Sequence, residues 1–226
     1  MAIMLKNSAD MSTLKVNLLG YGQSGAGKTY AIRTLPNPVV LSAEGGLLSI
    51  SDVQIPFIEI KSMSELMEAY QWLTQSEEAK QFDSVAIDSI SEIGEVCLST
   101  KKKGAKDKRM AYGEMADQIS EIIRNFRDIP GKHVYMTAKL EQAKDELGRL
   151  LYYPSMPGNK TTQGLPYFFD QCLAFRVEKD QDGNEQRMIQ TRSDGLWQAK
   201  DRGGRLDPWE YPDLGNIINK IKGVKQ

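Results

Sequence analysis

The sequence has few of the residues that disulfide-stabilised, zinc-binding or membrane-spanning proteins require. Its 226 residues include two cysteines and one histidine, which are too few for a disulfide framework or a typical zinc site. No run of about 18 apolar residues is present, so no membrane-spanning helix is expected. Residues 1–12 lack the basic stretch, apolar core and cleavage site of a secretory signal. We therefore expect a reduced, cytoplasmic setting and no membrane partner.

Charge of one sign is not in excess either, because the formal net charge is −1. The total therefore gives no indication of a nucleic-acid partner. The distribution is more informative, since residues 101–109, KKKGAKDKR, hold six cations and one acid. Such a run is either a solvated loop or a contact for phosphate groups. Its candidate DNA-binding residues are Lys101, Lys102, Lys103, Lys106, Lys108 and Arg109.

Apolar, β-branched runs alternate with helical patterns, which favours an α/β fold with a mostly parallel sheet and helices on both faces. We treat residues 1–13 as a leader or assembly segment and residues 14–226 as one domain. The polar segment 139–168 has no periodicity and is predicted to be irregular. Strands are predicted at 14–20, 38–43, 84–88 and 132–138, and a β-hairpin at 172–179 and 187–192 near the carboxyl end. Helices are predicted at 28–35, 64–73, 91–98, 113–126 and 214–221.

Residues 22–29, GQSGAGKT, match the phosphate-binding pattern G-x-x-x-x-G-K-[ST] between a predicted strand and a predicted helix. The glycines let backbone N–H groups converge on phosphate oxygens. Lys28 is expected to bridge the outer phosphates, and Thr29 to bind Mg²⁺ through its hydroxyl. The predicted nucleotide-binding residues are Gly22, Gln23, Ser24, Gly25, Ala26, Gly27, Lys28, Thr29 and Tyr30.

Two acids follow strands that should lie beside this loop. Asp88 ends the strand SVAID and can hold the magnesium shell, commonly through water; the alternative is an aspartate that caps the next helix. Glu44 follows the strand in VVLSAEGGL, where a carboxylate can orient or deprotonate an attacking water. The alternative for Glu44 is a solvated acid at a strand end. A GTPase is disfavoured because AKLE at 138–141 lacks the asparagine of the guanine-reading pattern N-K-x-D.

In order, VLSAEGGL, SVAIDSI, MPGNKTTQGLPYFFDQCLAFRVEK and WQAKDRGGR resemble the ATPase core of RecA-type recombinases over about residues 14–206. The resemblance extends to the short, phage-encoded RecA-like single-strand annealing proteins of the phage P-loop ATP-binding family. It implies a RecA-like P-loop NTPase core that uses ATP and Mg²⁺ and binds single-stranded DNA by two loops. It also implies self-association as a ring or filament with ATP at subunit interfaces. Host cytoplasm would then be the setting, and a single-strand-binding protein is a further candidate partner.

The resemblance also implies roles for individual residues. Glu44 occupies the place of the catalytic glutamate, with Lys28 in the same catalytic set, and Asp88 that of the Walker B acid. Lys200 and Arg202 match paired cations that reach the phosphates of an adjacent subunit, where they can stabilise transition-state charge. Taken without the resemblance, these two cations are more simply an exposed charge pair on a hairpin.

The resemblance places a first DNA-binding loop at 101–109 and a second at 140–162. Cations in the second could neutralise phosphates, and its two tyrosines could stack bases or equally pack as loop core. The family ends its fourth strand with Asn-Gln, whose glutamine senses the γ-phosphate, whereas this chain has Thr137 and Ala138. The candidates in the second loop are Lys144, Arg149, Tyr152, Tyr153 and Lys160.

The predicted function is therefore ATP and single-stranded DNA binding that promotes single-strand annealing or homologous recombination, with modest DNA-stimulated ATP hydrolysis. Two other functions stay open. One is a DNA-binding module that uses ATP as a conformational ligand with negligible turnover. The other is a P-loop small-molecule kinase with the basic segments as a lid, although a water-activating glutamate argues against a reaction that gains by excluding water.

Overall fold

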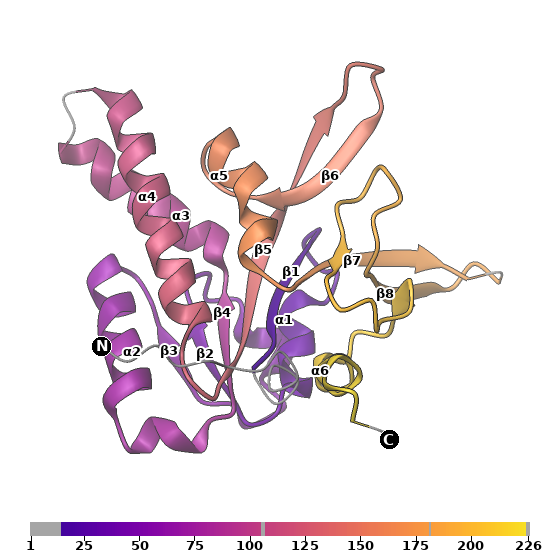
Figure 1. Ribbon diagram of the computed structural model, residues 1–226, viewed down its shortest axis with the longest axis horizontal. Helices are drawn as coiled ribbons and strands as arrows, with labels where there is room; N and C mark the ends of the chain where they lie inside the picture. Colours follow the sequence, from indigo (N-terminus) through magenta and orange to yellow (C-terminus); the bar gives the residue numbers. More distant parts are fainter. Residues whose placement is uncertain (1–14, 105–106, 181, 225–226) are drawn as a thin grey trace, which may run out of the picture.

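The computed structural model describes residues 15–104, 107–180 and 182–224 (Figure 1). The predicted leader, residues 1–13, and the candidate Lys106 lie outside the described residues. Within those three ranges, no helix combines the length and the apolar character that crossing a membrane would require.

A single large sheet carries the fold, with the strand order β10-β8-β7-β1-β5-β4-β2-β3. All pairs from β7 to β3 in this order are parallel, whereas β8 and β10 are antiparallel additions. Outside this order, β6 pairs with β5 and β9 with β7, both antiparallel. The predicted fold class, a mostly parallel sheet with a β-hairpin near the carboxyl end, is confirmed. The strands are β1 (Asn17–Gly22), β2 (Pro38–Ser42), β3 (Phe57–Glu59), β4 (Ser84–Asp88), β5 (His133–Lys144), β6 (Leu150–Ser155), β7 (Gln171–Lys179), β8 (Glu185–Gln190), β9 (Lys200–Asp201) and β10 (Trp209–Glu210).

Helices cover both faces of the sheet because successive residues of a strand point to opposite sides. Leu18 and Leu19, neighbours in β1, are both fully buried but belong to different apolar clusters. Leu19 shares its cluster with side chains of α2, α3 and α4, and Leu18 shares its cluster with side chains of α1 and α6. The helices are α1 (Lys28–Ala31), α2 (Met63–Gln75), α3 (Ile90–Gly104), α4 (Lys108–Arg127), α5 (Asn159–Gly164) and α6 (Leu214–Lys222), with 3-10 turns η2 (Ile32–Thr34), η3 (Leu47–Ile50), η4 (Glu78–Gln81) and η5 (Leu165–Phe168).

Local signals set several helix ends. The Ser62 hydroxyl accepts a hydrogen bond from the Glu65 N–H (3.2 Å), and the Glu65 carboxylate accepts one from the Lys61 N–H (2.6 Å). This reciprocal capping starts α2 at Met63, one residue before the predicted start at 64, with Ser62 as the cap. Helix α6 begins after the Asp213 cap and ends at Lys222, where Gly223 caps it with a φ of 72° that suits glycine. The helix predicted at 113–126 is confirmed as part of α4, and the apolar residues that recur along it at helical spacing are buried: Met115, Ile119, Ile122 and Phe126.

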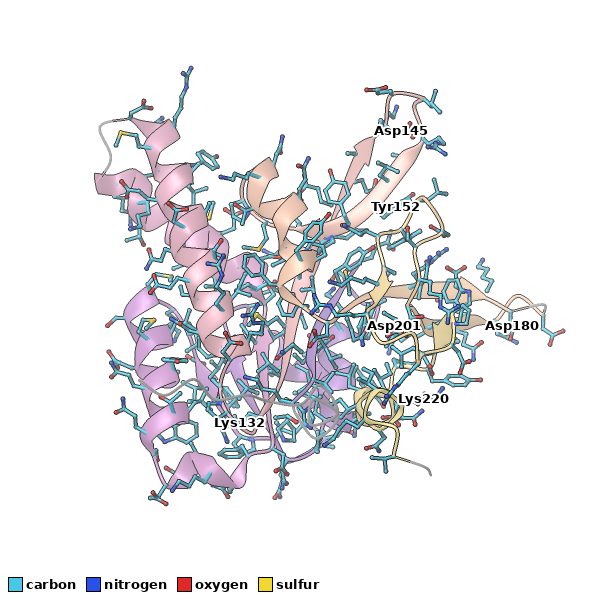
Figure 2. The ribbon with its side chains drawn as sticks, viewed as in Figure 1. Lys132, Asp145, Tyr152, Asp180, Asp201 and Lys220 are labelled. Atoms are coloured by element: carbon cyan, nitrogen blue, oxygen red, sulfur yellow. The ribbon has the colours of Figure 1, made fainter. Side chains whose placement is uncertain are left out.

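The segment 139–168 is regular, so the prediction of an irregular loop is wrong. Strand β5 runs on to Lys144, and after a turn at Asp145 the chain returns as β6. The Asp145 carboxylate accepts hydrogen bonds from the N–H groups of Leu147 (2.9 Å) and Arg149 (2.8 Å). Such turn chemistry sets a hairpin without any hydrophobic periodicity. Figure 2 shows Asp145 near the tip of this β5–β6 hairpin, away from the body of the sheet.

The described residues of the basic run, 101–104 and 107–109, are largely helical, which corrects the prediction of a loop. Its first three lysines form the last turn of α3, and the Asp107 carboxylate caps α4 by accepting the Arg109 N–H (2.8 Å). Lysine is a good helix former, so a cluster of its charges does not by itself end a helix. The resulting α3–α4 hairpin and the β5–β6 hairpin both project toward the top of the view in Figure 1.

Candidate nucleotide-binding site

The loop from β1 to α1 has the conformation that its glycines permit. A Cβ added to Gly22 would lie 2.3 Å from the Phe175 carbonyl oxygen of β7, so only glycine fits there. Gly27 has a φ of +99°, a left-handed conformation that other residues rarely adopt. A Cβ added to Gly25 would meet nothing within 4 Å among the described residues. The backbone of this loop therefore borders open space, as a phosphate cradle requires.

Lys28 is held in the loop that it follows. Its Nζ donates to the carbonyl oxygens of Gly22 (2.8 Å) and Gln23 (3.0 Å). Burial lowers the pKa of the Lys28 ammonium, and the carboxylates of Asp88 and Glu44 act in the opposite direction. The ammonium is thus already partly desolvated at the loop and lies within the electrostatic influence of the two acids, which suits an outer-phosphate contact.

Asp88 ends β4 as predicted and is almost completely buried. One carboxylate oxygen accepts the Thr29 hydroxyl (2.8 Å), and the other accepts the hydroxyl of Thr137 from β5. Hydroxyl and carboxylate oxygens are ligands that Mg²⁺ takes together with phosphate oxygens and water. The predicted pairing of Thr29 with Asp88 therefore matches the donor set of a magnesium site.

Glu44 lies beside Asp88 because β2 and β4 are adjacent parallel strands, with Ser42 opposite Asp88. The N–H groups of Ala43 (2.7 Å) and Glu44 (3.2 Å) both donate to the Asp88 carbonyl oxygen. The Glu44 carboxylate accepts the hydroxyl of Ser89. Backbone and side chain are thus both oriented by the last residue of β4 and the residue after it.

A cation also faces Glu44. The Nζ of Lys139, on β5, lies 2.6 Å from the Glu92 carboxylate and 3.9 Å from that of Glu44. The hydrogen bond with Glu92 raises the pKa of the Lys139 ammonium. The Lys139 N–H donates to the Ser91 hydroxyl, which in turn donates to the Ser155 carbonyl oxygen of β6. The start of the β5–β6 hairpin is therefore joined to α3 beside the candidate catalytic acid.

Two buried tyrosines support the site from the sheet. The Tyr135 hydroxyl donates to the Lys28 carbonyl oxygen (3.3 Å), and burial raises the pKa of Tyr135. The Tyr21 hydroxyl donates to the carbonyl oxygens of Tyr152 (3.1 Å) and Gln198 (2.7 Å), and burial raises the pKa of this phenol as well. Both phenols are therefore neutral hydrogen-bond donors that fix the loop and the strands around it.

The four residues predicted to act on the phosphates lie at one edge of the sheet: Lys28, Thr29, Asp88 and Glu44. Their supporting contacts from Ser89, Thr137 and Lys139 were not predicted. Thr137 lies beside Asp88 because β4 and β5 are parallel with Ile87 opposite Met136, so that Asp88 and Thr137 come next in register. The sequence alone does not show that these two strands are neighbours.

Lys200 and Arg202 lie elsewhere. Strand β9 pairs with the beginning of β7, whereas the loop at Gly22 lies opposite Phe175 farther along β7. Within the chain, the Lys200 Nζ donates to the carbonyl oxygens of Pro166 (2.7 Å) and Phe169 (2.6 Å). Arg202 forms an ion pair with Asp170 (2.8 Å). Their action on the phosphates of an adjacent subunit stays a prediction.

The candidate DNA-binding cations that the structure describes lie on the two hairpins and on α5. Most are exposed, and a few have partners: Lys101 lies 3.7 Å from Glu114, and Arg149 lies 2.7 Å from Asp145. The Lys102 ammonium lies over the Tyr112 ring at 4.8 Å. The exposed candidates are Lys102, Lys103, Lys108, Arg109, Lys144, Arg149 and Lys160.

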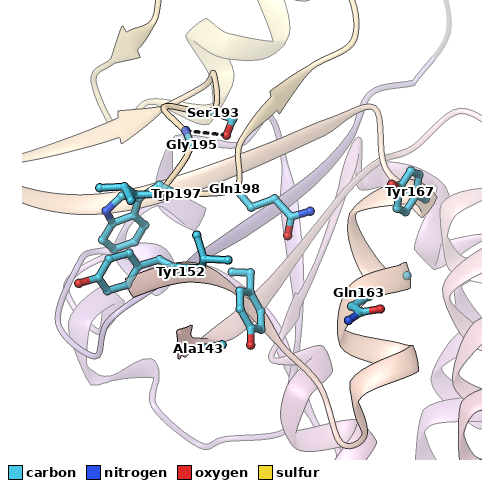
Figure 3. Close-up of a pocket in the computed structure, with 12 residues that line it drawn as sticks. Ala143, Tyr152, Gln163, Tyr167, Ser193, Gly195, Trp197 and Gln198 are labelled. Atoms are coloured by element: carbon cyan, nitrogen blue, oxygen red, sulfur yellow. Dashed lines mark hydrogen bonds between the residues drawn. The ribbon is translucent and has the colours of Figure 1, made fainter. Parts of the chain in front are cut away.

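The candidate tyrosines border a cavity of about 750 Å³ between the β5–β6 hairpin, α5 and the segment 193–198 (Figure 3). The Tyr152 ring stacks on Trp197, with centroids 4.3 Å apart and planes inclined by 10°. This contact favours the packing role for Tyr152. Tyr153 is half-buried and lines the cavity together with the exposed Tyr167. The stacking of bases on either candidate stays a prediction.

Comparison with known proteins agrees with this geometry. A family model described as an AAA domain matches residues 14–203, which include the glycine loop, both acids and both hairpins. A search of curated proteins found no match. The motif GQSGAGKT, its place between β1 and α1, and the match along most of the chain agree. The chain belongs to the AAA domain family of P-loop nucleotide-binding proteins.

Proposed function

We propose that this protein hydrolyses ATP in a Mg²⁺-dependent reaction and that single-stranded DNA controls the reaction. The observation that carries the proposal is the position of Glu44. Its carboxylate lies beside the Thr29–Asp88 pair and is oriented by Ser89. A carboxylate at this place can activate water for hydrolysis, whereas a kinase gains by excluding water from its site.

Each residue has a role in the proposed reaction. The loop N–H groups and Lys28 hold the phosphate chain and offset its charge. Thr29 and Asp88 would hold Mg²⁺, which neutralises charge on phosphate oxygens when it is bound. Glu44 accepts a proton from water as the water oxygen bonds to the terminal phosphorus and the bond to ADP breaks. The Ser89 hydroxyl keeps the Glu44 carboxylate turned toward that water.

The DNA-binding part of the proposal is supported by the connection of the two hairpins to the nucleotide site. Helix α3 begins two residues after Asp88 and ends in the lysine turn, while β5 passes Asp88 at Thr137 and continues to the exposed Lys144. Cations at the ends of both elements can neutralise phosphates of a flexible strand. A strand held there would bias the position of the same elements that orient Asp88 and Glu44. Binding of two such strands side by side would promote annealing or recombination.

Self-association is part of the same proposal. Lys200 and Arg202 lie away from the chain's own glycine loop, which supports a role at the nucleotide of a neighbouring copy. A ring or filament with ATP at the subunit interfaces provides that arrangement. Arg202, which is exposed and forms an ion pair with Asp170, is the more accessible of the two cations.

The proposal is tested with wild type, Lys28→Ala and Glu44→Gln. Phosphate release and ATP binding are measured with and without oligo-dT. Lys28→Ala should lose ATP binding, because the cation that offsets the phosphate charge is gone. Glu44→Gln should still bind ATP but turn over about 10²–10⁴-fold more slowly. Glu121→Gln, an isosteric change of an exposed acid on α4, is the matched control and should behave like wild type.

Three outcomes would contradict the proposal. Unchanged turnover in Lys28→Ala would remove the phosphate role of the loop, and unchanged turnover in Glu44→Gln would remove the catalytic role of that acid. Retention of oligo-dT that needs ATP but releases no phosphate would show a gated binding module. Wild-type protein that does not bind oligo-dT would end the DNA-binding part.

A further inference from the structure

A guanidinium that the motif does not include lies against the glycine loop. Arg187 is on β8, and a Cβ added to Gly27 would lie 3.2 Å from its Cδ and 3.8 Å from its Nε. The same guanidinium lies 6.0 Å from the centroid of the Tyr30 ring, one turn into the element that follows the loop. Strand β8 thus brings a cation to the phosphate cradle from about 160 residues farther along the chain.

Arg187 has no carboxylate partner among the described residues, whereas an arginine beside the same tyrosine ring and one on the paired strand each have one. Arg33, which lies over the same Tyr30 ring at 4.7 Å, is paired with Asp52 at 2.8 Å. Arg176, on the paired strand β7, lies 2.5 Å from Glu178. Among the described residues, the ring contact with Tyr30 is the one interaction of the Arg187 side chain. Its hydrogen-bond donors are therefore available to an anion.

The place of Arg187 in the sheet indicates which part of the nucleotide it would meet. Glu44 follows β2 and Asp88 ends β4, on one side of the glycine loop, whereas β8 lies on the other side, beyond β7. The two acids mark the end where hydrolysis is proposed. Arg187 lies at the opposite end of the cradle, beside Gly27 and Tyr30.

We propose that Arg187 is a phosphate-binding residue, supplied by the same chain, that contacts the phosphate chain next to the nucleoside. The inference rests on the proposed function in taking the glycine loop as the cradle of a nucleoside triphosphate. A guanidinium is suited to this task because its planar donors match two phosphate oxygens at once. Since the contact is with the inner phosphates, ATP and ADP share it.

The test measures equilibrium binding of fluorescent ATP and ADP analogues to wild type, Arg187→Ala and Arg187→Met. Arg187→Met keeps an apolar stem over Gly27 and Tyr30 but removes the charge. Both variants should bind ATP and ADP about tenfold more weakly, and by the same factor for each nucleotide. Their ADP affinity should also depend less steeply on salt concentration. Lys179→Ala removes an exposed cation farther along the same β7–β8 hairpin and should bind both nucleotides like wild type.

Several results would overturn the inference. Unchanged affinity in both Arg187 variants would show that the guanidinium does not contact the nucleotide. Weaker binding of ATP alone would place Arg187 at the terminal phosphate. Weaker binding with an unchanged salt dependence would show that Arg187 stacks on the base and does not contact a phosphate. Wild-type protein that binds neither nucleotide would instead refute the proposed function, so the two failures are distinguishable.

Discussion

The hydrogen bond from Thr137 to Asp88 can be tested with a change of one atom type. Thr137, on β5, is fully buried, and its hydroxyl donates to one oxygen of the buried Asp88 carboxylate. The other oxygen accepts the Thr29 hydroxyl. Thr137→Val replaces the hydroxyl by a methyl group of similar size, so no cavity is created, but the methyl group cannot donate and needs a longer contact with the carboxylate oxygen. The variant removes one hydrogen-bond donor from a buried carboxylate.

The magnitude follows from that loss. A hydrogen bond to a charged group contributes about 1.5–3 kcal/mol, and removing the donor leaves a carboxylate oxygen buried without its partner. We expect the free energy of unfolding to fall by about 2 kcal/mol. For a chain of this length, about 2–4 °C of Tm corresponds to each kcal/mol, which gives a decrease of about 4–8 °C.

Urea denaturation and thermal unfolding of wild type, Thr137→Val and Thr137→Ser measure the effect. Thr137→Ser is the matched control because it keeps the hydroxyl and removes a methyl group, so it should be the more stable variant. A Thr137→Val protein as stable as wild type would refute the argument that this hydroxyl holds the Asp88 carboxylate.

Two further predictions concern pH and salt. His133 Nδ1 accepts the Val16 N–H (2.9 Å), and burial, with help from Lys222, lowers the pKa of the imidazole. Below about pH 6.5 the unfolded chain binds a proton that the folded chain excludes. The free energy of unfolding should therefore decrease as the pH is lowered below this value. His133→Gln, which removes the chain's one histidine, should flatten urea-denaturation stability across pH 5.5–7.5; equal slopes would contradict this. Replacing lysines 101–103 by glutamine should reduce the slope of log affinity for oligo-dT against log salt by about 2, measured by fluorescence anisotropy. Replacing Lys61 and Lys80 by glutamine is the control. A slope equal to that of wild type in the 101–103 variant would show that these three lysines are solvated and do not contact DNA.

Features that depend on neighbouring residues were predictable from the chain alone. GQSGAGKT could be identified as a phosphate-binding loop because the glycines, the lysine and the hydroxyl act together within eight positions. The acids at 44 and 88 were found because each directly follows an apolar run, and parallel strands end at one edge of a sheet. The helix at 113–126 was found because its apolar side chains recur at helical spacing.

The rest depends on which strands become neighbours, and this pairing is a property of the folded chain. The Thr137 donor reaches Asp88 across 49 positions of sequence because β5 and β4 are paired. Arg187 reaches Gly27 because β8 joins the sheet outside β7, and neither residue carries a local mark of the contact. The β5–β6 hairpin forms through a turn of polar side chains, and hydrophobic periodicity does not predict such a turn. Local patterns thus set the elements and the phosphate loop, while burial of both sheet faces selected the strand order that completes the site.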